Sequence, residues 1–223
     1  MCGRFTLTVD PEELMERFHL SMADAPLTPR YNIAPTQNVA VVLNASTDRL
    51  SLVRWGLIPG WATGPSIGAQ MINARSETLA QKPAFRAAFK KRRCLVLADG
   101  FYEWRKEADG RTKTPMYARL LTGEPFAMAG LWEDWKSPQG LAYRTCTIIT
   151  TEPNDLLSPI HNRMPAILPR ELEAEWLRDS MSEEVLKSML RPYVVGDMQV
   201  YPVSRRVNTP AYDEPALIKP IVT

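Results

Sequence analysis

Seven short apolar segments, separated by residues that favour turns, govern how this chain can fold. They lie at residues 39–43, 50–55, 94–98, 115–120, 125–131, 144–150 and 199–203. Segments of this length, rich in aliphatic and aromatic side chains, are typical of β-strands. Because they do not alternate regularly with helices, they predict an α+β fold whose β core is mainly antiparallel and barrel- or sandwich-like. We expect one domain over residues 1–223, with a few peripheral helices.

Three helical regions are predicted around this core. Asp10 and Pro11 are residue types preferred at the N-cap and the first position of a helix. A second helix is predicted where Phe85 and Phe89, four residues apart, would share one buried face. A third helical region is expected at about residues 170–190.

The second of these helices has an outer face rich in cations. The residues are Lys82, Arg86, Lys90, Lys91, Arg92 and Arg93, and no acidic residue lies among them. A run of this kind is most often a solvated face, which we prefer here to contact with a DNA backbone.

Composition excludes several classes of protein. The 27 Lys and Arg residues nearly balance the 25 Asp and Glu residues, so a net charge of +2 is too small for bulk polyanion binding. Cys2, Cys94 and Cys146 are odd in number and widely spaced, which fits neither a disulfide framework nor a zinc site. With only His19 and His161, no metal site is predicted. Without a secretory signal or membrane span, we expect a cytoplasmic protein, associated with the nucleoid if its source is bacterial.

Cys2 has the most distinctive chemistry in the chain. A small side chain at this position normally permits removal of Met1, which would leave an exposed N-terminal cysteine. Reference pKa values of about 7.7–8.0 for its α-amine and about 8.5 for its thiol leave both groups reactive at neutral pH. The amine can condense with an aldehyde to an imine, on which the thiolate can close to form a thiazolidine. The alternative is a frayed terminus with an incidental thiol.

Three further residues lie in segments typical of functional loops. Glu103 lies between Tyr102 and Trp104, and burial among aromatic side chains would raise the pKa of its carboxyl. Asn73 precedes a predicted helix cap, and His161 lies in a proline-bounded loop. Ordinary alternatives are a salt-bridged strand residue for Glu103, a turn former for Asn73 and a satisfied loop histidine for His161.

Seven motifs occur in order from residue 1 to about residue 208. They are Met-Cys-Gly-Arg-Phe at 1–5, Tyr-Asn-Ile-Ala-Pro at 31–35, Trp-Gly-Leu-Ile-Pro-Gly-Trp at 55–61, Asn-Ala-Arg-Ser-Glu-Thr at 73–78, Asp-Gly-Phe-Tyr-Glu-Trp at 99–104, His-Asn-Arg-Met-Pro at 161–165, and Pro-Val-Ser with Val-Asn at 202–208. Together they resemble the SRAP family, the SOS-response-associated peptidase-like proteins that process abasic sites. Every catalytic residue that the family pattern requires is present in this sequence.

The resemblance implies a specific reaction. Members of this family bind single-stranded DNA that contains an abasic site and crosslink to it covalently, a lyase-type activity that needs no metal or organic cofactor. Carried over, Cys2 is the nucleophile through both its amine and its thiol. Glu103 is expected to transfer protons during crosslink formation and reversal, and His161 to exchange protons with the sugar oxygens. Asn73 is expected to orient the sugar and Cys2.

Five residues are expected to contact the DNA. Arg4, Arg75 and Arg163 lie beside the predicted catalytic residues and are expected to contact phosphates. Trp61 and Trp104 are expected to stack on bases or wedge between them, which tolerates any sequence. The implied partner is single-stranded DNA with an abasic site, and we expect a monomer with no membrane partner.

Two other functions stay open. A terminal cysteine whose own amine acts as base is the arrangement of N-terminal-nucleophile hydrolases, so the chain would be a cysteine peptidase that processes its own leader. Alternatively, it would be a non-covalent reader of single-stranded or modified DNA in which Cys2 is incidental.

Overall fold

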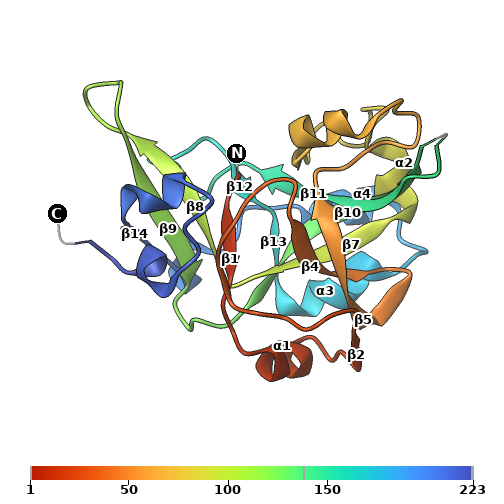
Figure 1. The fold of residues 1–223 in the computed structure, drawn as a ribbon, viewed down its shortest axis with the longest axis horizontal. Coiled ribbons are helices and arrows are strands. Elements are labelled where there is room, and N and C mark those ends of the chain that lie inside the picture. Colours follow the sequence, from red (N-terminus) through yellow and green to blue (C-terminus); the bar gives the residue numbers. More distant parts are fainter. Residues whose placement is uncertain (1, 138, 222–223) are drawn as a thin grey trace.

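The computed structural model describes residues 2–137 and 139–221 and contains two β-sheets with short helices around them (Figure 1). The predicted α+β fold, with mainly antiparallel strands and few helices, is confirmed. All seven predicted strands are present. Several extend beyond their apolar segments, because their outer ends continue pairing as exposed hairpins.

Five strands close into a barrel. They are β4 (Asn38–Leu43), β5 (Ser46–Trp55), β7 (Arg93–Ala98), β10 (Phe126–Lys136) and β11 (Ala142–Thr151). Neighbours pair antiparallel in the order β11, β10, β7, β4, β5, and β5 then pairs with β11 in parallel to close the ring. Every residue of β7 is buried, which explains why its sequence is a continuous apolar run rather than an alternating one.

The second sheet has five antiparallel strands in the order β14, β9, β8, β1, β3. Their bounds are β1 (Phe5–Leu7), β3 (Arg30–Ile33), β8 (Gly100–Lys106), β9 (Lys113–Leu120) and β14 (Met198–Pro202). The segment that forms β3 is not among the seven predicted strands and overlaps the motif at residues 31–35. Pairing with β1 makes this segment a strand, with Ile33 opposite Phe5. The start of the chain is therefore held on both sides.

Four two- or three-residue strands extend the barrel. They are β2 (Met22–Ala23), β6 (Asn73–Arg75), β12 (Met164–Pro165) and β13 (Ile167–Leu168). Both β6 and β12 pair with β11, β6 in parallel and β12 antiparallel. The helix cap predicted after Asn73 is wrong, because residues 73–75 form β6 and the residues that follow form turns until α2 begins.

Within residues 2–137 and 139–221, four α-helices and four short 3₁₀ segments surround the sheets. The helices are α1 (Pro11–Arg17), α2 (Arg86–Lys91), α3 (Arg170–Leu177) and α4 (Glu183–Met189), and the 3₁₀ segments are Pro65–Gln70, Val195–Asp197, Arg205–Asn208 and Pro215–Ile218. Asp10 caps α1 as predicted, and Phe85 and Phe89 are buried. The predicted region 170–190 divides into two helices, the second of which is capped by Ser182. Over the described residues we find no helix that could serve as a transmembrane span.

Arg93 departs from the predicted cationic face. It is fully buried at the start of β7, and its guanidinium donates to four backbone carbonyl oxygens on α2 and at the end of α3. Burial lowers its pKa. Arg93 therefore joins two helices to the barrel and is not available to a ligand.

Candidate active site at the junction of the two sheets

Four predicted residues converge where the antiparallel sheet meets the barrel. Cys2 and Glu103 belong to the antiparallel sheet, on the segment that leads into β1 and on β8. Asn73 and His161 are attached to the barrel, since Asn73 begins β6 and His161 lies in the loop before β12. Segments about 30 to 70 residues apart in sequence thus meet at one place.

Cys2 is held in the main core of the protein. Its residue is 0% exposed, and its Sγ lies 3.9 Å from the carbonyl oxygen of Arg4. Burial, with the negative charge of Glu103 as second cause, raises the pKa of the thiol to about 12. An exposed, partly ionised Cys2 stays a prediction for the chain that has lost Met1, whereas the chain that carries Met1 holds this residue buried. In this form the sulfur is a neutral thiol.

Glu103 faces Cys2 from the neighbouring strand. The backbone N–H of Tyr102 donates to the Arg4 carbonyl, and this antiparallel register brings Glu103 beside the start of the chain. Glu103 is 3% exposed, and burial raises the pKa of its carboxyl to about 7. Tyr102 and Trp104 pack in a separate cluster on the opposite face of β8, so the aromatic neighbours are not what buries it.

His161 lies beside Glu103. Its Nδ1 lies 4.0 Å from Oε1 of Glu103 and accepts a hydrogen bond from the Arg163 backbone N–H at 3.0 Å. The same Nδ1 lies 3.3 Å from the Arg163 carbonyl oxygen, so its role as donor or acceptor depends on the tautomer of the ring. Burial lowers the pKa of His161, which keeps the imidazole neutral at neutral pH.

Asn73 links the barrel to Cys2. Its Nδ2 donates to the carbonyl oxygen of Cys2 at 2.8 Å. Its Oδ1 is buried and has no hydrogen-bond partner among residues 2–137 and 139–221. An unsatisfied buried acceptor costs free energy, so this amide is poised for a donor.

The three arginines predicted to contact DNA differ in their availability. Arg75 is exposed at the end of β6. Arg4 is half-buried and donates from Nη1 to Asn32 at 2.7 Å. Arg163 is 9% exposed, and its Nη atoms bind the Glu77 carboxylate at 2.6 and 3.0 Å. Arg163 therefore anchors the His161 loop, and its contact with a phosphate stays a prediction that requires Glu77 to release it.

The tryptophans divide in the same way. Trp61 is 60% exposed in the loop after β5. Trp104 is half-buried, and its Nε1 donates to Oδ1 of Asn208 at 2.8 Å. Trp61 thus offers a free ring face, whereas Trp104 is fixed to the C-terminal segment. Stacking of either ring on DNA stays a prediction.

Some site-building residues are not among the predicted ones. Asn32 is fully buried and accepts from Arg4, while its Nδ2 donates to three carbonyls of the C-terminal segment. Asn32 lies in the motif at residues 31–35, so its place in this motif could have indicated a role at the site. Lys113 is exposed on β9, and its positive charge lowers the pKa of both Glu103 and His161.

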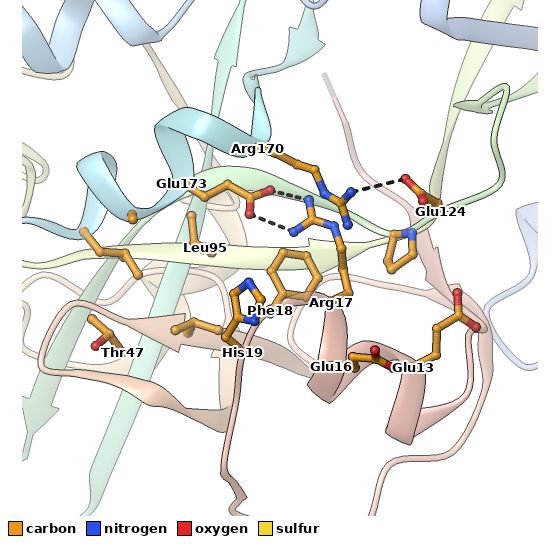
Figure 2. Close-up of a pocket in the computed structure, with 14 residues that line it drawn as sticks. Glu13, Glu16, Arg17, Phe18, His19, Thr47, Leu95, Glu124, Arg170 and Glu173 are labelled. Carbon is orange, nitrogen blue, oxygen red and sulfur yellow. Dashed lines mark hydrogen bonds and ion pairs between the residues drawn. The ribbon is translucent and has the colours of Figure 1, made fainter.

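A separate cavity lies away from the four converging residues. About 860 Å³ opens between α1, α3 and the barrel, where Arg17 and Glu173 face each other (Figure 2). It contains none of the four converging residues. In the part of the chain that the structure describes, no cluster of three or more potential metal ligands is found.

Comparison with known proteins gives this site a family. Residues 1–210 match the family model described as SOS response associated peptidase (SRAP). The abasic site processing protein YoqW of Bacillus subtilis is 47% identical over 98% of this chain and 99% of its own, and YedK of Escherichia coli is 31% identical over 99% and 100%. A crystal structure of a protein from Bacteroides thetaiotaomicron covers 99% of this chain and 100% of its own, with 28% identity and a TM-score of 0.90. The chain belongs to the SRAP family.

Proposed function

We propose that this chain captures abasic sites in single-stranded DNA by forming a thiazolidine through Cys2, as an abasic-site processing protein of the DNA damage response. The observation that carries the proposal is the convergence of Asn73, Glu103 and His161 on a cysteine that one cleavage would make N-terminal. The relatives named for abasic site processing support it.

Removal of Met1 would give Cys2 an α-amine beside its thiol. The Asn73 amide already holds the Cys2 carbonyl and presents a buried acceptor without a partner in the described chain. That acceptor can take a hydrogen bond from the new amine or from a hydroxyl of the sugar. Either contact would relieve its desolvation and fix the nucleophile against the substrate.

The amine would attack the open aldehyde of the abasic deoxyribose to give a carbinolamine. A carboxyl with a pKa near 7 is present in both forms at neutral pH, so protonated Glu103 can give its proton to the departing hydroxyl, which leaves as water. The carboxylate then accepts the thiol proton while sulfur bonds to the iminium carbon, whose electron pair returns to nitrogen. Glu103 ends protonated, as it began.

His161 would assist opening of the closed sugar. Its neutral ring lies beside Glu103, so it can accept the proton of the anomeric hydroxyl while protonated Glu103 gives its proton to the ring oxygen. The imidazolium then returns a proton to the Glu103 carboxylate, and the net charge of the buried site is unchanged. Arg163 sets the position of His161 through the backbone and through the ion pair with Glu77. Exposed Arg75 and Trp61 are the most accessible of the proposed DNA contacts.

A denaturing gel tests the proposal. We expect the mature protein to form a band that survives denaturation with a single strand bearing one abasic site, and no band with an undamaged strand or with a tetrahydrofuran analogue that has no aldehyde. Cys2→Ser keeps the amine but not the thiol, so its adduct should require borohydride trapping. Intact mass shows whether Met1 has been removed.

The same variants distinguish the two other functions. A peptidase would cleave a peptide library in a manner that Cys2→Ser abolishes, while giving no band with DNA. A non-covalent reader would bind and protect abasic DNA equally well as Cys2→Ser. Absence of a covalent band with the mature parent protein contradicts the proposed function.

A further inference from the structure

The exposed side of α2 and of the turn before it carries cations that the proposed reaction does not use. Lys82, Arg86 and Lys90 are four residues apart, and the Arg86 N–H donates to the Lys82 carbonyl at 2.9 Å, so helical spacing continues through the turn. Residues at this spacing share one face, with about 6 Å between neighbours along the axis. With Lys91 they form the α2 cationic patch (Lys82, Arg86, Lys90 and Lys91).

The patch is available to a ligand. All four side chains are exposed, and none forms an ion pair with another residue in the described ranges. Arg86, Lys90 and Lys91 line a surface hollow of about 410 Å³ together with two alanines and Arg92. Arg92 is bound to Glu133 at 2.6 Å. The small alanine side chains leave room for an anionic group between the cations.

Helix stability does not account for this arrangement. Lys90 and Lys91 in the last turn are favourable, because cations interact well with the negative end of the helix dipole. Lys82 and Arg86 lie at the opposite end, where acidic residues are preferred and none occurs in the first turn. The charges at the start of α2 therefore oppose the local preference.

A short hydrogen-bonded path joins the patch to the candidate site. Strand β6 begins with Asn73 beside Cys2 and ends with exposed Arg75. From there, consecutive turns lead to the patch, with the Leu79 N–H donating to the Arg75 carbonyl and the Lys82 N–H to that of Thr78, each at 3.0 Å. In Figure 1 both α2 and the start of the chain lie toward the top of the view, whereas α1 and α3 lie toward the bottom.

In place of the solvated face that the sequence alone favours, we propose that the α2 cationic patch binds the phosphodiester backbone of the DNA strand beyond the abasic nucleotide. The inference rests on the proposed function, which places a strand at Asn73 and Arg75. Single strands are bound by cationic grooves that follow the backbone irrespective of sequence, and the patch supplies three charges at regular spacing. It would extend the footprint of the protein along the strand without adding any base preference.

The salt dependence of binding tests this surface separately from crosslinking. The double variant Arg86→Gln with Lys90→Gln is compared with the parent on undamaged single strands of about 4 and about 16 nucleotides. Each phosphate contact contributes about 0.7 to the slope of log affinity against log salt, so the slope for the longer strand should fall by about 1.4. The short strand should bind both proteins alike.

A matched pair of charges provides the control. Arg170→Gln with Arg178→Gln removes the same charge from the exposed ends of α3 and should leave both slopes unchanged. An unchanged slope for the longer strand with the α2 variant overturns the proposal, as does no binding of that strand by the parent. Binding of a glutamate-rich peptide that depends on the patch, with the DNA slope unaltered, would assign it to an acidic protein and also overturn it.

The two proposals can fail separately. If the parent gives no covalent band with an abasic strand while the slope still depends on Arg86 and Lys90, the reaction is wrong and the surface holds. If the α2 variant crosslinks a short abasic strand as the parent does and shows an unchanged slope on the long one, the surface is wrong and the reaction holds.

Discussion

The carboxyl of Glu103 is buried by its position between the two sheets, not by the aromatic residues beside it in the sequence. Alternate residues of a strand point to opposite faces, so Tyr102 and Trp104 pack away from it. A raised pKa is predictable from an apolar segment, whereas its cause required knowledge of the β1–β8 register. The same register brings Glu103 to Cys2.

Replacement of Glu103 by Gln should stabilise the fold at neutral pH. The pKa of Glu103 is about 7 in the folded state and 4.5 without the protein environment, so between these values the folded state binds more protons. Its stability therefore falls as pH rises through this window. The variant should gain up to about 3 kcal/mol over the parent by pH 7, and little at pH 4.

Thermal unfolding at several pH values measures this difference. Glu152→Gln, which alters an exposed carboxyl, serves as the control and should follow the parent. A stability difference between Glu103→Gln and parent that does not change with pH would show that the carboxyl is not desolvated. The gain in stability should accompany a loss of crosslinking, as expected for a residue retained for function.

The four converging residues were predictable individually because each lies in a motif rich in turn-forming or reactive residues. Their supporting partners were not. Asp99 begins the same motif as Glu103, but the motif does not indicate its partners: Asp99 accepts from the Thr6 hydroxyl at 2.5 Å and from the Thr8 hydroxyl at 2.6 Å. Such contacts cross more than 90 residues and leave no local pattern.

The length of each strand, and its pairing with a neighbouring strand, explain which strands the sequence could predict. The apolar strands of the barrel have enough buried side chains to show their pattern. Strands β1, β6 and β12 have two or three residues each and exist because a longer strand offers a free edge. Those short strands carry or adjoin Cys2, Asn73 and His161, so the site was harder to locate than the core.

Asp99 should be the main anchor of β1. Its Oδ2 accepts from both the backbone N–H and the hydroxyl of Thr8, and its own N–H donates to the Thr6 carbonyl at 3.0 Å. In Asp99→Asn one acceptor oxygen becomes a donor that faces other donors. We expect a loss of about 2–3 kcal/mol in unfolding free energy and faster amide exchange in β1.

Denaturant titration and hydrogen exchange check this expectation. Tyr117→Phe removes only the hydroxyl that contacts the Thr6 hydroxyl at 2.8 Å, so it should cost less than Asp99→Asn. Equal losses of unfolding free energy in the two variants would show that the Asp99 carboxylate does not anchor β1 more strongly than the Tyr117 hydroxyl does. Unchanged exchange in β1 would show that the strand is anchored elsewhere.

For the whole molecule, closure of the barrel is what the sequence could not predict. It depends on two parallel residue pairs between β5 and β11, Thr145 with Arg54 and Cys146 with Trp55. Neither segment differs from an ordinary antiparallel strand in its pattern. The sequence therefore predicts a core that is either a barrel or a sandwich and does not distinguish between them.

The ion pair in Figure 2 connects distant parts of the chain. Arg17 at the end of α1 binds Glu173 of α3 through two bonds, at 2.7 and 3.0 Å, with side chains 9% and 10% exposed. Arg17→Leu should cost about 3–5 kcal/mol, because it leaves a buried carboxyl without its partner. Adding Glu173→Leu should recover most of this loss.

Unfolding of the single and double variants in denaturant measures the recovery. Arg49→Leu is the control, because it breaks an exposed pair with Asp24 and should cost less than about 1 kcal/mol. A double variant as unstable as Arg17→Leu would mean that the two side chains contribute through packing around the cavity. The pair would then stabilise the fold through the volume that its side chains fill and not through their charges.

The division of the candidate site between two sheets has a mechanical consequence. Cys2 and Glu103 belong to one sheet, and Asn73 and His161 belong to the segments that pair with β11 of the other sheet or lead into them. A nucleotide bound by all four residues would connect the two sheets, so that separating the sheets would first require release of the damaged strand. Under the proposed function, the folded protein would be most resistant to unfolding while it is bound to a lesion.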